Sequence, residues 1–139
     1  MRVRNLVALV VMIAVAWAAW RSWPRPELEI TVSGPPLVNV TVPALGAQDR
    51  VGEAAFSNNC AVCHGRNAAG RQGIAPPLVH KIYEPDHHGD EAFVRAAQRG
   101  VRAHHWPFGD MPPVKDITDT EIDSIIAYIR TLQRANGIR

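Results

Sequence analysis

Two cysteines and a histidine in the middle of the chain have the types and spacing that most clearly imply chemistry. Cys60, Cys63 and His64 form a C-x-x-C-H run, and these are the only cysteines among 139 residues. This run is the attachment signature of haem c. The two thiols can add across the two vinyl groups of one haem, and the imidazole then lies beneath the iron. We therefore predict a covalent haem c with His64 as an axial iron ligand.

Other uses of a C-x-x-C pair fit this chain less well. A zinc site would need two more ligands and, without a third cysteine, would have to recruit histidines such as His87 and His88. A thioredoxin-like pair should open a helix within a βαβ unit, whereas loop-forming Gly, Ala and Asn follow Cys63. A disulfide between cysteines this close is rarer still. Haem attachment is the favoured interpretation.

The second axial position of the iron separates an electron carrier from a ligand-binding centre. Met1 and Met12 lie in the N-terminal segment, so Met111 is the only thioether in the rest of the chain. It precedes two prolines, which stiffen the loop and make core filling a poor explanation for the methionine. We predict Met111 as the second ligand. His104 or His105 is the alternative and would produce a bis-histidine haem of lower potential.

Helical signals dominate from residue 49 onward. The pattern predicts helices capped by Asp49, by Asp90 and by a Thr118–Glu121 capping box, the last being the clearest because isoleucines follow it at helical spacing. Three helices and loops cannot bury a large core in about 90 residues. A haem should therefore supply much of the apolar filling of a small all-α domain.

These features together resemble a class I monohaem cytochrome c over roughly residues 49–135. The C-x-x-C-H run is followed by Met-Pro before a C-terminal amphipathic helix, and four residues match the positions where the family's first and last helices cross: Gly52, Phe56, Ile125 and Tyr128. The resemblance implies three main helices around the haem. It also implies that the Pro76 carbonyl accepts the second N–H of His64 and that Leu78 lines the haem.

The N-terminus carries a second signal, which is read as a membrane anchor or signal segment over residues 1–23. Leu6–Trp20 contains no charge, which suits a signal-peptide core or a short anchor. Three distal tryptophans favour an anchor over residues 6–23, although Ala16 and Ala18 could form a cleavage site. The resemblance places the haem domain outside the membrane. We therefore predict a single-pass protein of the bacterial plasma membrane facing the periplasm, or alternatively a soluble periplasmic protein after cleavage.

The rest of the chain divides into an extended Pro-rich linker, residues 24–48, with weak signals for short strands, and a haem domain, residues 49–139. The formal net charge is +2, but the part after residue 26 holds 11 basic and 13 acidic residues, a charge of −2. The basic pI therefore gives no reason to expect nucleic-acid binding. Only Lys81 and Lys115 supply lysines, so docking through a lysine-rich face is in doubt.

Five histidines exceed what an electron carrier needs: His80, His87, His88, His104 and His105. The simplest explanation is that they are polar residues of solvent-exposed loops. The alternative is a second metal site, with copper as the best guess.

The predicted function is that of a single-electron carrier, and not an enzyme, with a periplasmic or membrane-bound donor and acceptor in a respiratory chain. The first alternative is a fixed haem subunit of a membrane-bound oxidoreductase complex. A second alternative is an enzyme or sensor in which Met111 leaves the iron and a small ligand binds.

Overall fold

The computed structural model describes residues 3–23 and 35–139, and it divides the chain into two compact units, Met1–Ile30 and Thr31–Arg139. In residues 3–8 only the helical backbone is described. The part of the predicted linker that spans residues 24–34, including the first weak strand signal, lies outside the described residues.

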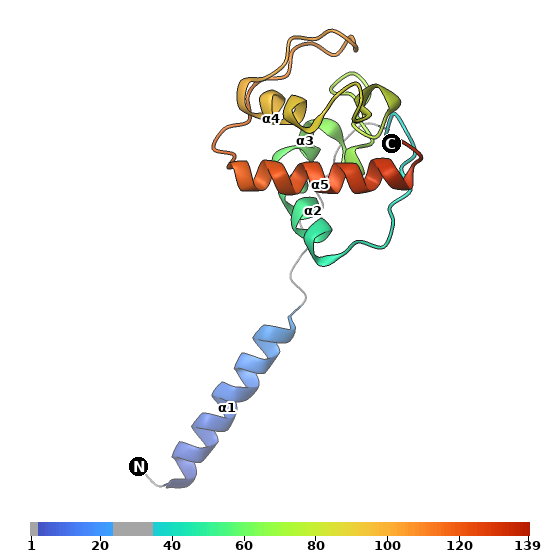
Figure 1. The fold of residues 1–139 in the computed structure, drawn as a ribbon. Helices are drawn as coiled ribbons and strands as arrows, with labels where there is room; N and C mark the ends of the chain where they lie inside the picture. Colours follow the sequence, from blue (N-terminus) through green and yellow to red (C-terminus); the bar gives the residue numbers. More distant parts are fainter. Residues whose placement is uncertain (1–2, 24–34) are drawn as a thin grey trace. The chain divides into compact units, whose positions relative to one another are not determined.

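The second unit is built from helices and loops (Figure 1). Its elements are α2 (Ala47–Asn59), α3 (Ala61–His64), η1 (Arg66–Ala68), η2 (Lys81–Tyr83), α4 (Asp90–Arg99) and α5 (Asp119–Ala135). In the described ranges the only β-type pairing is two isolated bridges, Arg71 with Ala75 and Val101 with Met111. The predicted all-α class is confirmed for this part of the chain.

The helix starts show which sequence signals were read correctly. At α5 the Thr118 N–H donates to Glu121 Oε2 at 2.9 Å and the Glu121 N–H donates to Thr118 Oγ1 at 3.3 Å, which is the predicted capping box. The other two helices begin after a glycine, Gly46 for α2 and Gly89 for α4. Asp49 lies inside α2 and accepts the Gly46 N–H at 3.1 Å. A carboxylate on the first turn can thus satisfy a terminal N–H without being the cap.

The core lies where α5 crosses α2 at a steep angle (Figure 1). A Cβ atom on Gly52 would lie 2.1 Å from Ser124 O and 2.8 Å from Tyr128 Cβ, so only glycine allows this approach. The rings of Phe56 and Tyr128 meet there with centroids 5.8 Å apart. The close crossing that the resemblance implied at Gly52 is therefore confirmed. The buried cluster around it comprises Phe56, Ala61, Ala68, Val79, Ile125, Tyr128, Ile129 and Leu132.

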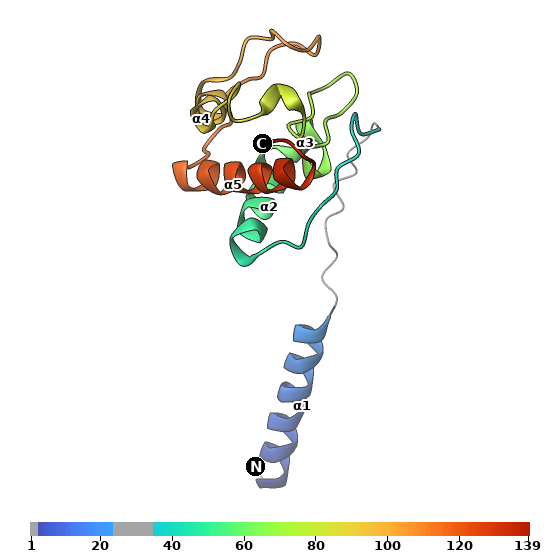
Figure 2. The same ribbon diagram turned by 45° about the vertical axis from the view of Figure 1, so that its right-hand side comes forward.

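Residues 35–46 belong to the predicted linker but pack on the helical unit, running beside the C-terminal end of α5 toward α2 (Figure 2). Val40 and Leu45 pack against the core cluster. The Thr41 N–H donates to Asn136 Oδ1 at 2.9 Å, and Asn136 Nδ2 donates back to Thr41 O at 2.9 Å. Apolar side chains and a paired backbone therefore hold this segment, which contains no strand.

Arg130 of α5 fixes the segment between η2 and α4. Its guanidinium donates to Tyr83 O at 2.8 Å, to His88 O at 2.6 Å and to Asp90 Oδ1 at 2.8 Å. It also lies 4.9 Å from the centroid of the Phe93 ring, and the residue is only 7% exposed. A planar cation with several donors is suited to hold two carbonyls and a carboxylate at once.

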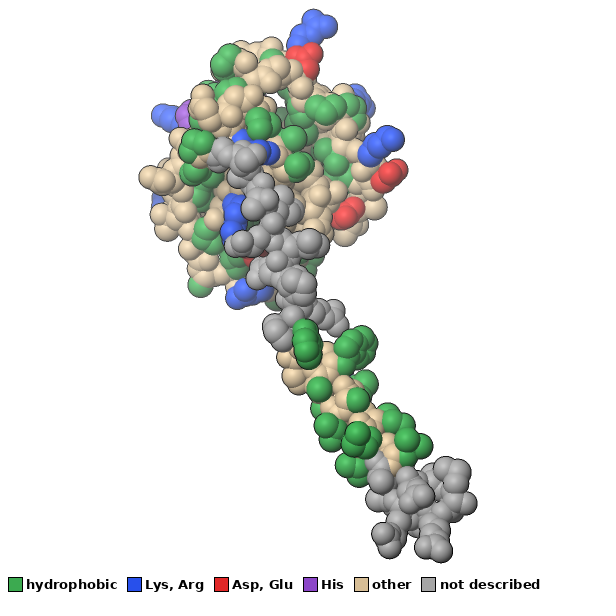
Figure 3. Space-filling model, turned by 180° about the vertical axis from the view of Figure 1, so that it is seen from behind, with side chains coloured by type: hydrophobic (Ala, Val, Ile, Leu, Met, Phe, Trp, Pro, Cys, Tyr) green, Lys and Arg blue, Asp and Glu red, His purple; other side chains and the backbone are tan. Residues whose placement is uncertain are grey.

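The described part of the first unit contains α1 (Val3–Ser22). Hydrophobic side chains lie along the described part of this helix (Figure 3). No helix in the described ranges is both long and apolar enough to cross a bilayer. Crossing a hydrocarbon core of about 30 Å takes about 20 consecutive apolar residues, and the uncharged run of the sequence, Leu6–Trp20, is shorter. The predicted single-pass anchor over residues 6–23, and with it the plasma-membrane localisation, is therefore wrong.

Candidate functional site

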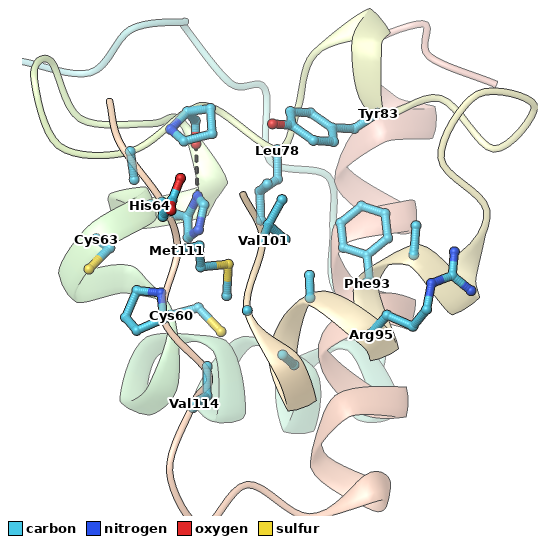
Figure 4. Close-up of a pocket in the computed structure, with 18 of the residues that line it drawn as sticks. Cys60, Cys63, His64, Leu78, Tyr83, Phe93, Arg95, Val101, Met111 and Val114 are labelled. Atoms are coloured by element: carbon cyan, nitrogen blue, oxygen red, sulfur yellow. Dashed lines mark hydrogen bonds between the residues drawn. The ribbon is translucent and has the colours of Figure 1, made fainter. Parts of the chain in front are cut away.

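A mostly apolar cavity of about 680 Å³ lies in the second unit, walled by α3, α4, α5 and the loops around residues 74–78 and 100–114 (Figure 4). Apolar lining residues from these elements include Leu78, Phe93, Val101, Ile125 and Ile129. Sites for small molecules and cofactors commonly have volumes of about 300–1,000 Å³ and apolar walls with a few placed polar groups. The cavity therefore has the size and lining of a cofactor site.

His64 ends α3 and lines this cavity while being only 7% exposed. Its Nδ1 lies 2.8 Å from Pro76 O, the dashed contact in Figure 4. Because a carbonyl can only accept, Nδ1 carries the proton and Nε2 keeps a free lone pair. Burial lowers the pKa of His64, and the bond to Pro76 opposes that shift. The side chain is thus a neutral, oriented imidazole, the form that ligates a metal.

The loop after α3 holds the Pro76 carbonyl in place. The Gly70 N–H donates to His64 O at 2.7 Å, and the Leu78 N–H donates to Ala68 O at 2.8 Å. Gly70 has a φ of +75°, and a Cβ there would lie 2.5 Å from the backbone nitrogen of Pro77. A residue with a side chain would therefore displace the turn that presents Pro76 to the imidazole.

The two cysteines lie at the edge of the cavity as free thiols, Cys60 half-buried and Cys63 exposed. Burial, and then the neighbouring Cys63, raises the pKa of the Cys60 thiol to about 11. Thiol–disulfide exchange starts from the thiolate, which such a shift disfavours. Among the described residues, the one group with the geometry of a metal site combines His87, His88 and His105 and contains neither cysteine. The zinc and redox-pair alternatives therefore lose support.

Met111 lies in the same cavity as His64 and Cys60 (Figure 4). Its loop is closed at the base by two hydrogen bonds between Val101 and Met111, each with an N–O distance of 2.9 Å. At Gly100, with a φ of +75°, a Cβ would lie 2.4 Å from Met111 O. The glycine that follows α4 thus allows the returning part of the loop to approach closely and to present the thioether.

A sequence model of the cytochrome c family matches residues 50–133, more than half of the chain. The chain belongs to the cytochrome c family. A comparison with curated proteins finds no match for it. Membership confirms the predicted cofactor, a covalently bound haem c with iron, for whose attachment the two cysteines are present, and it makes the chain a haem-based electron carrier. Family members in general transfer electrons rather than transform substrates.

The residues of this cytochrome fit the haem. All six predicted site residues line the one cavity: Cys60, Cys63, His64, Pro76, Leu78 and Met111. The alternative ligands His104 and His105 also border it, but both are exposed near the tip of the Met111 loop. The role of each residue toward the iron stays a prediction.

Trp106 was missed by the sequence reasoning. It lines the cavity of the cytochrome, and its buried indole Nε1 makes no hydrogen bond of normal geometry with the described residues, although it lies near enough to the Tyr83 hydroxyl to oppose the rise that burial causes in the pKa of Tyr83. Because an unmet buried donor is costly, this N–H suits an acceptor on the bound group, such as a haem carboxylate. The only signal in the sequence was a large aromatic residue within a polar loop.

Proposed function

We propose that this cytochrome passes single electrons between redox partner proteins, with His64 and Met111 as the two axial ligands of its haem. The bound haem supplies the redox chemistry, since its iron exchanges one electron between the ferric and ferrous states. The observation that carries the proposal is the cavity that a neutral imidazole and a thioether share with both attachment cysteines. Two protein ligands would leave no position for a substrate, which favours electron transfer over catalysis.

The residues around the two proposed ligands support electron transfer because hydrogen bonds hold the ligands in position. Pro76 orients His64, and the paired backbone of Val101 and Met111 holds the thioether loop. Ligands that do not move between oxidation states keep the reorganisation small. The apolar walls exclude water, and a less polar surrounding disfavours the extra positive charge of the ferric state, so a relatively high potential is expected.

The rim around Cys63 is where we expect the partners to dock. Val62 is 55% exposed and Ile74 is 43% exposed, and the Arg71 guanidinium donates to Val62 O and so joins their two segments. Ile74 also lines the haem cavity. A small apolar rim beside the cofactor suits a contact that forms and separates quickly, because little area is buried.

Replacement of Met111 tests the axial assignment. The reduced Met111→Ala holoprotein should bind carbon monoxide rapidly and stoichiometrically and show a lower midpoint potential, because the strongest competitor for the sixth position is gone. The reduced wild-type protein should bind little. His104→Ala and His105→Ala are the matched controls, since both rings border the same cavity.

The proposal fails if Met111→Ala keeps the wild-type absorption spectrum and resists carbon monoxide, or if a histidine variant opens the site instead. Rapid carbon monoxide binding by the wild-type protein would favour a sensor or enzyme.

A further inference from the structure

Four histidines from two separate loops gather beside the haem cavity. His87 and His88 precede α4, and His104 and His105 lie near the tip of the loop that carries Met111. The ring centroids are 4.7 Å apart for His87 and His88, 5.2 Å for His88 and His105, and 5.5 Å for His87 and His105. One ligand nitrogen from each of these three rings lies within 4.8 Å of the others. Tertiary structure thus brings together imidazoles 17 positions apart in the chain.

Hydrogen bonds of the ring and of the backbone hold His88 in place. Its Nδ1 lies 2.6 Å from Ile82 O, so Nδ1 must donate and Nε2 keeps its lone pair. Its backbone N–H donates to Glu84 O at 2.8 Å, and its carbonyl accepts from Arg130 at 2.6 Å. Histidines that bind metals almost always donate their other ring N–H to a carbonyl, carboxylate or water, which fixes the tautomer and raises the basicity of the ligating nitrogen.

The opposite loop is also held. The Ala103 N–H donates to Asp110 Oδ1 at 2.8 Å across the loop that bears His105. His104 Nδ1 lies 2.8 Å from Arg102 O, so a second ring of the group has a carbonyl partner and a free Nε2. Its centroid is 4.2 Å from that of His105 and 6.2 Å from that of His88. His104 is therefore near enough to complete the coordination by a side-chain rotation.

The simpler explanation, that these histidines are ordinary polar residues of solvent-exposed loops, does not account for this arrangement. Rings spread over a surface have no reason to converge, and four protonated imidazoles at these separations would repel one another. A metal held at about 2.0–2.1 Å from each nitrogen needs nitrogens about 3.3 Å apart in a tetrahedral site, which exposed rings can reach from the present spacing. A donor set of imidazoles alone suits Zn²⁺, Cu²⁺ and Ni²⁺, and Cu²⁺ binds most tightly in the divalent series.

We propose that His87, His88 and His105 form a binding site for one divalent transition metal, preferentially Cu²⁺, separate from the haem iron. His104 or water completes the coordination. The metal would join the segment before α4 to the loop that carries Met111.

Cu²⁺ alone is the probe, added to the full-length ferric holoprotein prepared without a histidine tag. Equilibrium dialysis should find one Cu²⁺ per haem with a Kd below about 1 μM, and electron paramagnetic resonance should show nitrogen hyperfine coupling. His87→Gln and His105→Ala, which change exposed rings, should each weaken binding by at least about tenfold. The control is His80→Asn, because His80 lies outside the group and asparagine preserves an acceptor for the Ile82 N–H.

The haem absorption spectrum of each variant shows that the fold and the haem ligands are intact, so loss of copper binding is separable from loss of the electron-transfer site. Equal copper binding by wild type, His87→Gln and His105→Ala would overturn the proposal. A wild-type Kd above about 1 μM would overturn it as well.

Discussion

Replacement of Gly52 by alanine should loosen the crossing of α2 and α5. The new Cβ would lie 2.1 Å from Ser124 O and 2.8 Å from Tyr128 Cβ, whereas ordinary contacts begin at 3.4 Å. The nearest atom is a helical backbone oxygen rather than the end of a flexible side chain. The two helices must therefore separate, and the contact between Phe56 and Tyr128 must loosen with them.

Two effects of opposite sign set the magnitude. Alanine is favoured over glycine within a helix by about 1 kcal/mol. Overpacking costs about 1–3 kcal/mol, and the upper end applies here because a gap of 0.5–1 Å forfeits about a quarter to a half of the dispersion energy at the contacts affected. The expected net loss is about 2 kcal/mol in the free energy of unfolding, which is about a 30-fold change in the folding equilibrium.

Urea unfolding of the holoprotein, followed by far-ultraviolet circular dichroism and haem absorbance, measures this loss. Gly89→Ala is the matched control, because Gly89 has no positive φ and its new Cβ would meet nothing closer than Pro85 O at 3.7 Å. The control should change stability by less than about 1 kcal/mol. If Gly52→Ala were as stable as Gly89→Ala, the close crossing would not be what requires glycine.

Three further outcomes can be measured. Arg130→Lys should lose about 2–3 kcal/mol in urea unfolding, because an ammonium cannot bond both carbonyls and the carboxylate that the guanidinium reaches. Hydrogen bonds from the Thr118 backbone and hydroxyl lower the pKa of Glu121, so its contribution is complete above the ordinary value of 4.5 and is lost as the pH falls through the lowered pKa. The stability advantage of wild type over Glu121→Gln should accordingly shrink in unfolding curves recorded below pH 4.5. Asn136→Ala removes both hydrogen bonds to Thr41 and should speed amide hydrogen exchange at Thr41, with about 1 kcal/mol lost; unchanged exchange would show that packing alone holds the segment.

Local sequence was sufficient for the covalent chemistry. A C-x-x-C-H run places two thiols and an imidazole within five residues, so attachment and one expected ligand need no knowledge of the fold. The capping box at Thr118 was readable for the same reason, since the helix start depends on residues three apart. The caps predicted for α2 and α4, Asp49 and Asp90, were misplaced because glycines cap both helices, and a glycine has no side chain to signal its role.

Only the tertiary structure decided which distant residues meet. It brought Met111 into the His64 cavity, packed residues 35–46 on the helices, and aimed Arg130 at the segment before α4. The convergence of His87, His88 and His105 had no local signal in the sequence. The same residues would be present in the sequence if the three side chains were scattered over separate loops. The apolar N-terminal run led to a wrong prediction, because its composition suggested a helix that crosses the bilayer, whereas no helix in the described ranges is long and apolar enough to do so. A motif whose residues are neighbours in the chain can be recognised from the sequence alone. A site assembled from separate loops depends on the packing of the core, which determines how closely those loops approach one another.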